Sequence, residues 1–320
     1  MKRASIVGVG SYVPEKVLTN FDLSKMVETS DEWIQERTGI RERRISAKNE
    51  ATSDLGIKAA KKALSSAGFA PEKIELIIVG TSSPDMLFPS TACIIQDQLG
   101  AVNSAAFDVS AACSGFNYAL AAASSFIESG LYNNVLVVGA DTLTKYLDWT
   151  DRNTCILFGD GAGAVMLNAS TDGSGVLANY LGAEGSGGKY LIMPGGGSRD
   201  PEAKKRFIWM DGKEVFKFAV KVLPKCVKKV LEKASLTVND ISILIPHQAN
   251  MRIVDFAVKN LGLSKEKVYV NLDKYGNTSA ASIPIALDEA SKEGRIKKGD
   301  IVTLAGFGAG LTYGSNIIKW

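Results

Sequence analysis

The chain has 320 residues, of which 46% are hydrophobic and 22% are charged, with a formal net charge of +3 and a single histidine. This composition excludes an intrinsically disordered chain, and the nearly balanced charge gives no basis for nucleic-acid binding. One histidine also excludes His-rich metal sites and any mechanism that needs two histidines.

The cysteines and the N-terminus indicate where the protein works. Cys93, Cys113, Cys155 and Cys226 form neither a CxxC pair nor a zinc-binding spacing, so we expect reduced thiols and no metal. The N-terminal apolar stretch is interrupted by Gly8 and is too short for a secretion signal. Since no run approaches the ~18 apolar residues of a membrane span, we expect a cytoplasmic protein without a membrane partner.

In chain order, predicted helices and buried strands alternate, and the same order occurs twice. Residues 61–78 have the pattern of an amphipathic helix followed by a short apolar strand, and residues 228–245 repeat it without a gap, 167 positions later. Strands are expected next at Ala105–Val109 and Val268–Asn271. Each precedes a helix that ends at a glycine, Gly130 or Gly294. Both halves then close with a Gly-rich turn into a last strand.

This repeat predicts two halves, 1–170 and 171–320, in a layered α/β sandwich with right-handed crossovers. The join is expected in Asn168–Gly175, which is rich in Ser, Thr, Asp and Gly. Chance similarity between two α/β segments is the alternative, and the ungapped offset favours duplication over it.

Cys113 is the first candidate for chemistry. It follows the strand 105–109 and precedes a nearly uncharged helix over Asn117–Ser129, which we expect to be central and buried. The positive end of a helix dipole favours the thiolate and lowers the thiol pKa. The alternative is a buried structural cysteine, which is how we interpret the other three.

His247 and Asn277 are the candidates in the second half. His247 follows the strand 241–245, at the strand end where α/β folds place their chemistry, and it corresponds to Gly80 under the repeat. Asn277 lies 164 positions after Cys113, the offset that also separates the two helix-ending glycines, so we expect it at the equivalent helix start. A hydrogen-bonded structural histidine and a helix N-cap are the alternatives.

Six motifs together span nearly the whole chain. They are Thr29–Ile40 (TSDEWIQERTGI), Ala112–Phe116 (ACSGF), Phe158–Ala164 (FGDGAGA), His247–Asn250 (HQAN), Gly276–Ser279 (GNTS) and Gly306–Gly310 (GFGAG). In combination they resemble the thiolase-like condensing enzymes, specifically the β-ketoacyl-acyl carrier protein synthase III family. The resemblance implies a duplicated five-layer αβαβα sandwich that forms a homodimer.

That resemblance also implies a reaction. Members of the family start fatty-acid synthesis by a decarboxylating Claisen condensation of an acyl-CoA primer, here acetyl or short branched, with malonyl-acyl carrier protein. Cys113 would carry the acyl group, and His247 and Asn277 would donate hydrogen bonds to the enolate oxygen. Acyl-CoA is then a substrate, and no cofactor is implied. A nucleotide loop at Gly159–Gly163 is not expected, because this turn leads into a strand.

Binding residues are implied in the same way. The resemblance assigns the CoA channel to Trp33, Arg37, Arg152, Gly212, Phe216 and Asn250. It assigns the carrier-protein contact to Gln248, Ala249, Asn250, Met251 and Arg252. It assigns the acyl pocket to Phe88, Phe158, Leu191 and Phe307, with Phe88 reaching the pocket of the partner subunit.

Three alternatives stay open. A stripe of Lys213, Lys217, Lys221 and Lys225 on one helix face is either a solvated surface or a docking site for the acidic carrier protein. The same fold also suits an acyltransferase that does not decarboxylate its substrate. A catalytically inactive paralogue acting as a scaffold or acyl-CoA sensor is the alternative without enzymatic activity.

Overall fold

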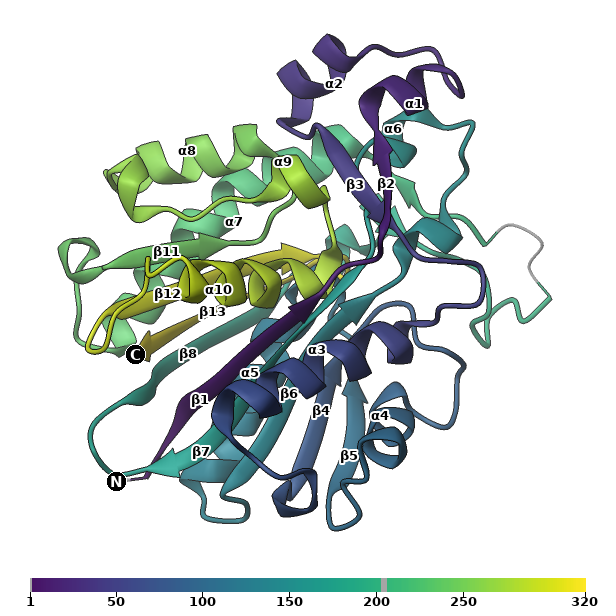
Figure 1. Ribbon diagram of the computed structural model, residues 1–320. Coiled ribbons are helices and arrows are strands. Elements are labelled where there is room, and N and C mark those ends of the chain that lie inside the picture. Colours follow the sequence, from purple (N-terminus) through teal and green to yellow (C-terminus); the bar gives the residue numbers. More distant parts are fainter. Residues whose placement is uncertain (1, 203–205) are drawn as a thin grey trace.

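Two β-sheets form the frame of the protein, whose computed structural model describes residues 2–202 and 206–320 (Figure 1). The first sheet has the strand order β1 (Arg3–Tyr12), β7 (Gly161–Ser170), β6 (Asn134–Asp141), β4 (Leu76–Gly80) and β5 (Ala105–Val109). The second has the order β11 (Ile243–Pro246), β12 (Ile301–Gly308), β13 (Thr312–Lys319) and β8 (Gly175–Ala183). Every strand of the first sheet precedes every strand of the second in the chain.

Helices form three layers around these sheets (Figure 1). The outer face of the first sheet is covered by α3 (Thr52–Ala67) and α4 (Thr91–Leu99), and that of the second by α7 (Gly212–Lys233) and α8 (Met251–Leu261). Between the sheets lie α5 (Gly115–Glu128) and α10 (Ser282–Lys292). Three large apolar clusters fill the gaps between the layers, the central one around Phe116 and Leu287. The expected five-layer αβαβα sandwich is confirmed.

Shorter elements form a cap over one end of the sandwich (Figure 1). They are the hairpin β2 (Lys16–Thr19) and β3 (Glu42–Ile45), α1 (Asn20–Ser24), α2 (Asp31–Thr38), α6 (Arg152–Cys155), α9 (Leu272–Tyr275), β9 (Leu191–Ile192) and β10 (Trp209–Met210). Apolar residues of β2, α1, α2, α6 and α9 pack together with Met251, which lies at the start of α8. Among the described residues, no helix has the length and apolarity to cross a bilayer.

The two halves correspond at the central helices in a way that the sequence did not predict. Short 3₁₀ turns, η2 (Ala112–Ser114) and η7 (Ser279–Ala281), lead directly into α5 and α10. Each begins with a left-handed residue, Ala112 with φ 47° and Ser279 with φ 51°. Matching these two residues makes Ala280 the counterpart of Cys113, so the expected equivalence with Asn277 is wrong. The misleading offset arises because α5 has 14 residues and α10 only 11, one helical turn fewer.

A strand expected at Val268–Asn271 is also wrong, since a single bridge between Leu244 and Val268 replaces it. The side chain of Gln248 takes the place of a neighbouring strand. Its Oε1 accepts the N–H of Asn271 at 3.2 Å, and its Nε2 donates to the carbonyl of Tyr269 at 3.4 Å. The chain is therefore held beside β11 by the backbone bond from Tyr269 to the carbonyl of Leu244 at 3.0 Å and by the Gln248 amide, before it bends into α9.

The boundary between the sheets falls between Ser170, which ends β7, and Gly175, which begins β8. This position lies inside the segment where the join was expected. The origin of the halves by duplication and their status as separate domains stay predictions, since the cap combines residues from both.

Candidate active site

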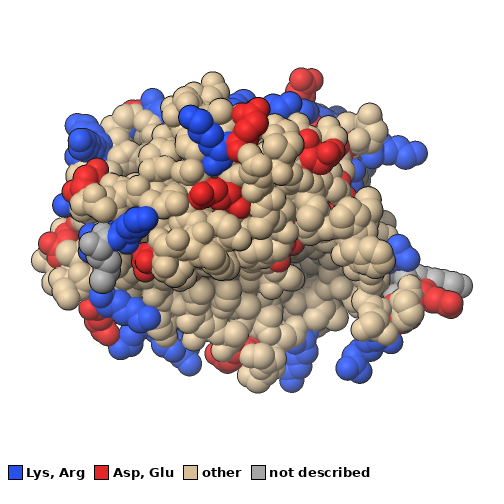
Figure 2. Space-filling model, turned by 90° about the horizontal axis from the view of Figure 1, so that it is seen from below, with Lys and Arg blue, Asp and Glu red and all other residues tan. Residues whose placement is uncertain are grey.

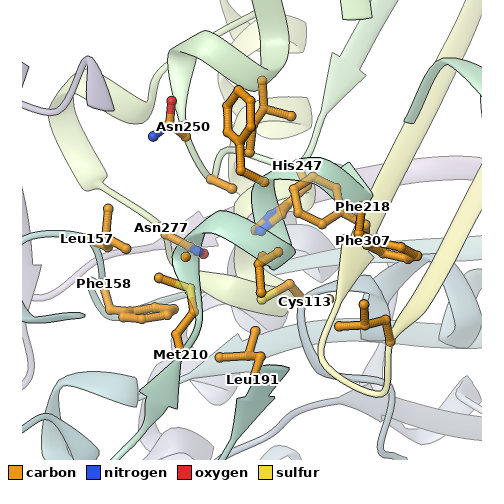
Figure 3. Close-up of a pocket in the computed structure, with 17 residues that line it drawn as sticks. Cys113, Leu157, Phe158, Leu191, Met210, Phe218, His247, Asn250, Asn277 and Phe307 are labelled. Carbon is orange, nitrogen blue, oxygen red and sulfur yellow. The ribbon is translucent and has the colours of Figure 1, made fainter. Parts of the chain in front are cut away.

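A pocket opens where the N-terminal ends of the two central helices meet, and Cys113, His247 and Asn277 all line it. In Figure 3 the imidazole of His247 and the amide of Asn277 point toward one another, with Cys113 beside them. The three side chains come from η2, from the end of β11 and from the turn after α9. His247 and Asn277, which follow Cys113 in the chain by 134 and 164 positions, thus share one site with it.

Backbone segments approach Cys113 so closely that glycine is required beside it. A Cβ atom added to Gly308 would lie 2.5 Å from the backbone nitrogen of Cys113. A Cβ added to Gly80 would lie 2.6 Å from the carbonyl carbon of Gly115. These contacts hold the start of α5 between β4 and β12, so the position of the thiol is fixed from both sheets.

Burial has a larger effect than the helix dipole on the pKa of the Cys113 thiol. It raises the pKa of Cys113 to about 12, and the buried carboxylate of Asp141 acts in the same direction. We expected a lowered pKa from the helix dipole; that expectation is wrong for the free enzyme, because desolvation of a thiolate outweighs the dipole. The thiol is therefore protonated near neutral pH in the free enzyme.

His247 is a buried, neutral imidazole. Burial lowers its pKa to about 3, so it carries no charge near neutral pH. Its backbone N–H donates to the carbonyl of Ala305 at 2.8 Å, which continues the pairing of β11 with β12. The ring lies edge-on against Phe307 with 5.4 Å between the ring centres, and Nδ1 is 2.6 Å from Oγ of Ser282.

Asn277 is held through its backbone and its side chain at once. Its N–H donates to the carbonyl of Leu157 at 2.8 Å, and its own carbonyl accepts the N–H of Gly159 at 3.0 Å. The side-chain Oδ1 accepts the N–H of Ser279 at 2.9 Å. Because a backbone N–H can only donate, this contact fixes the amide orientation and leaves the NH2 group to face the pocket.

The residues expected to bind CoA lie along a path from this pocket to the cap. Gly212, Phe216 and Asn250 line the pocket itself. Nδ2 of Asn250 donates to the carbonyl of Arg37 at 3.0 Å, which joins the pocket to α2. The guanidinium carbons of Arg37 and Arg152 lie 5.2 and 5.1 Å from the ring centre of Trp33. One aromatic ring and two cations thus gather at the outer end of the path.

The segment expected to contact a carrier protein is only partly at the surface. Arg252 is exposed, with its guanidinium 5.6 Å from the ring centre of Phe216, while Ala249, Asn250 and Met251 are half-buried. Gln248 is buried and occupied by the backbone contacts that bend the chain after β11. Its expected contact with a docked protein stays a prediction, and the buried side chain is not at the surface of the free chain.

The acyl-pocket residues divide into two groups. Phe158, Leu191 and Phe307 line the pocket around Cys113. Cys113, Phe158 and Leu191 also line a second apolar pocket. Its other lining residues include Leu143 and Ile208, which the sequence did not single out because nothing local distinguishes them from core residues. Phe88 lines neither pocket of its own chain; it is 84% exposed on the loop before α4.

Known proteins are similar to this chain in fold and sequence over almost its full length. Family models described as "3-Oxoacyl-[acyl-carrier-protein (ACP)] synthase III" and its "C terminal" part match residues 107–185 and 231–320. The beta-ketoacyl-[acyl-carrier-protein] synthase III of Caldanaerobacter subterraneus is 60% identical over 99% of this chain and 98% of its own. The corresponding crystal structures from Aquifex aeolicus and Thermus thermophilus are 51% and 47% identical. Both have a TM-score of 0.94, cover 99% of this chain and are matched over 100% and 99% of their own.

The fold and these relatives define a condensing enzyme of the thiolase class, which transfers acyl groups in fatty-acid biosynthesis. Within that class, the chain belongs to the β-ketoacyl-acyl carrier protein synthase III family.

Proposed function

We propose that this chain joins an acyl-CoA primer to malonyl-acyl carrier protein through an acyl group carried on Cys113, with His247 and Asn277 as hydrogen-bond donors. The observation that carries the proposal is the convergence of one thiol and two neutral donors on a single pocket. The proposed steps need no further group, so acyl-CoA is a substrate and no cofactor takes part.

In the first half-reaction, the Cys113 sulfur attacks the thioester carbon of acyl-CoA. The oxygen of the tetrahedral intermediate is stabilised by the N–H of Cys113 and by one from the turn 308–310, because backbone donors fixed in place stabilise developing charge without reorganising. The thioester bond to CoA then breaks, and the CoA sulfur takes up the proton that the Cys113 thiol has lost.

In the second half-reaction, malonyl-acyl carrier protein enters and loses its carboxylate as carbon dioxide. The electron pair of the broken bond moves into an enolate whose oxygen faces His247 and Asn277. Each donor to such an oxygen contributes about 10²–10³ in rate. The enolate carbon then attacks the acyl group on Cys113, the bond from the acyl carbon to the sulfur breaks, and the β-ketoacyl product is released. The freed thiolate takes up a proton from water and so becomes the thiol of the next cycle.

Surface features support the partners in this proposal. Trp33 with Arg37 and Arg152 offers a flat, cationic site for the nucleotide end of CoA, because guanidinium groups pair with phosphate and stack on rings. Exposed Arg252 at the pocket rim suits an acidic carrier protein. Four cysteines without a disulfide suit the cytoplasm.

A homodimer completes the proposal. Strand β5 ends the first sheet without a second neighbour among the described residues, and the nearby loop exposes Met86, Leu87 and Phe88. An apolar strand edge of this kind is normally covered in native proteins. In the dimer, Phe88 would reach the acyl pocket of the partner.

Separate assays of the two half-reactions test the proposal. We expect Cys113→Ala to take up no acyl mass from acetyl-CoA, measured by intact-protein mass spectrometry, whereas Cys93→Ala acylates normally. We expect His247→Ala and Asn277→Ala to acylate but to release carbon dioxide from malonyl-acyl carrier protein about 10²–10³ times more slowly. Acyl transfer without any carbon dioxide release in the unmodified enzyme would favour the acyltransferase alternative instead.

A further inference from the structure

Ser282 is the first residue of α10, and it lies beside the only histidine of the chain. Its Oγ is 2.6 Å from Nδ1 of His247, and the backbone N–H of Gln248 donates to the same oxygen at 3.4 Å. The side chain is buried and lines neither pocket around Cys113. Of the two partners of its hydroxyl group, only His247 lines the pocket, so the imidazole is the direct route from Ser282 to a bound substrate.

The direction of this hydrogen bond follows from the neighbours of the hydroxyl group. A serine hydroxyl has one hydrogen to donate. The Gln248 N–H is itself a donor, and within the described ranges 2–202 and 206–320 the Ser282 hydroxyl has no partner besides these two. Helical serines often donate to a carbonyl in the preceding turn, as Ser124 and Ser125 do on α5. Ser282 does not, so its hydrogen points to Nδ1 of His247.

We propose that Ser282 is a positioning residue that holds the imidazole of His247 in the tautomer with hydrogen on Nε2 and presents that N–H to the pocket. This inference rests on the proposed function, in which His247 donates to the enolate oxygen. A neutral imidazole has one N–H and one lone pair. With Nδ1 occupied as an acceptor, Nε2 must carry the hydrogen; in the other tautomer Nε2 would present a lone pair to the developing negative charge.

The tautomer can be observed directly, because the protein has a single histidine. When the full-length protein is labelled with ¹⁵N-histidine, long-range ¹H–¹⁵N NMR spectra show one imidazole spin system. At neutral pH we expect a protonated Nε2 and an unprotonated Nδ1. In Ser282→Ala we expect a shift toward the opposite tautomer or a mixture of both. A wild-type spectrum with hydrogen on Nδ1 would overturn the proposal.

Kinetics separate positioning from a merely structural role. We expect Ser282→Ala to slow carbon dioxide release from malonyl-acyl carrier protein at least tenfold, up to the ~10²–10³ of a lost donor, with acetyl transfer to Cys113 unchanged. The double variant His247→Ala/Ser282→Ala should match His247→Ala alone, because the serine acts only through the ring. Ser124→Ala removes an equally buried helix hydroxyl and should leave both rates unchanged.

The outcomes distinguish this inference from the proposed function. Normal decarboxylation in His247→Ala would remove His247 from the mechanism and the role of Ser282 with it. Loss of decarboxylation in His247→Ala together with a wild-type rate in Ser282→Ala would overturn the role of Ser282 alone. A further loss in the double variant beyond His247→Ala would show that the serine acts on folding instead of on the ring.

Discussion

In the proposed reaction, Cys113 has to lose its proton in surroundings that disfavour a thiolate. With its pKa raised to about 12, the thiolate fraction rises about tenfold with each pH unit throughout the neutral range. We expect the rate of alkylation of Cys113 by iodoacetamide to rise in the same proportion between about pH 7 and pH 9. Peptide mass spectrometry measures this rate, with exposed Cys93 as the internal reference. A plateau near neutral pH would mean that the helix dipole prevails over burial.

Arg43 is a buried cation that helps to fix the backbone of the pocket. It is fully buried, and its guanidinium donates to the carbonyl of Leu18 at 3.2 Å, to Oδ1 of Asn20 at 2.8 Å and to the carbonyl of Ile156 at 2.7 Å. The last contact fixes the segment whose next residue, Leu157, accepts the N–H of Asn277. Arg43 thus links the β2–β3 hairpin to the backbone of the pocket.

We expect Arg43→Met to lower the free energy of unfolding by about 3 kcal/mol, because three buried acceptors lose their donors at once. The neighbouring Arg44 is partly exposed and pairs with Glu42 at 3.5 Å. Arg44→Met, a control of the same size and charge change, should cost less than about 1 kcal/mol. Urea titration followed by circular dichroism measures both. Equal losses would mean that the burial of Arg43 contributes nothing specific.

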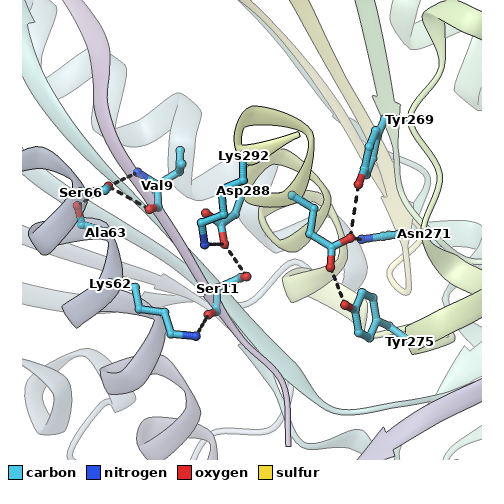
Figure 4. A network of polar contacts seen from close by, with 11 residues as sticks. Val9, Ser11, Lys62, Ala63, Ser66, Tyr269, Asn271, Tyr275, Asp288 and Lys292 are labelled. Atoms are coloured by element: carbon cyan, nitrogen blue, oxygen red, sulfur yellow. Dashed lines mark hydrogen bonds and ion pairs between the residues drawn. The ribbon is translucent and has the colours of Figure 1, made fainter. Parts of the chain in front are cut away.

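Helix α10 is tied on two sides by adjacent carboxylates (Figure 4). Asp288 accepts from the hydroxyl of Ser11 on β1 at 2.6 Å and pairs with Lys292 at 2.7 Å. Glu289 faces the other way and accepts from Tyr275, from Asn271 at 2.9 Å and from Tyr269 at 3.4 Å. The first carboxylate anchors α10 to the sheet, while the second anchors it to α9, which leads into Asn277.

This division predicts different effects for two similar substitutions. In Glu289→Gln, one carboxylate oxygen is replaced by an NH2 group, which donates hydrogen bonds instead of accepting them. This group would face side chains that now donate to Glu289, so we expect α9 to be held less firmly against α10. We expect decarboxylation to fall about tenfold or more, since small displacements of a positioned group are costly, with acylation of Cys113 unchanged. Asp288→Asn should cost about 1–2 kcal/mol of stability but leave the ratio of the two half-reactions unaltered. Equal changes of that ratio in both variants would contradict the assignment.

Elements that periodicity defines well were predicted from the sequence, while contacts across layers were not. The layered sandwich and the helix start near Cys113 followed from apolar patterns and glycine stops. Cys113 and His247 were singled out because each follows an expected strand, whereas Asn277 was singled out by an offset that the structure does not support. The strand at Val268–Asn271 failed because a distant side chain, Gln248, replaced its partner. Ser282 and Glu289 were missed because their roles depend on which segments the fold brings beside them, a fact that no local pattern carries.

At the scale of the whole molecule, surface charge and strand edges suggest what the protein contacts. In Figure 2 the charged side chains lie mainly around the rim of the face, with both signs interspersed and without a single basic patch. The free edge of β5 is the feature that calls for a partner. The N–H of Ala105 donates to the carbonyl of Glu75, and the carbonyl of Val109 accepts the N–H of Thr81. Because successive residues of a strand direct their backbone groups to alternate sides, the N–H of Ala106 points away from β4.

This geometry allows a substitution that affects the edge alone. Ala106→Pro removes the outward N–H and no hydrogen bond to β4, because the N–H of this residue points away from that strand. If two β5 strands pair across the dimer, the wild-type protein should sediment at twice 34.1 kDa and the proline variant at 34.1 kDa. Ala106→Gly keeps the N–H and should remain dimeric.

Analytical ultracentrifugation at micromolar concentration measures the masses, and circular dichroism checks the fold. A dimeric proline variant would place the interface away from this edge, and the proposed passage of Phe88 into a partner pocket would lose its structural basis.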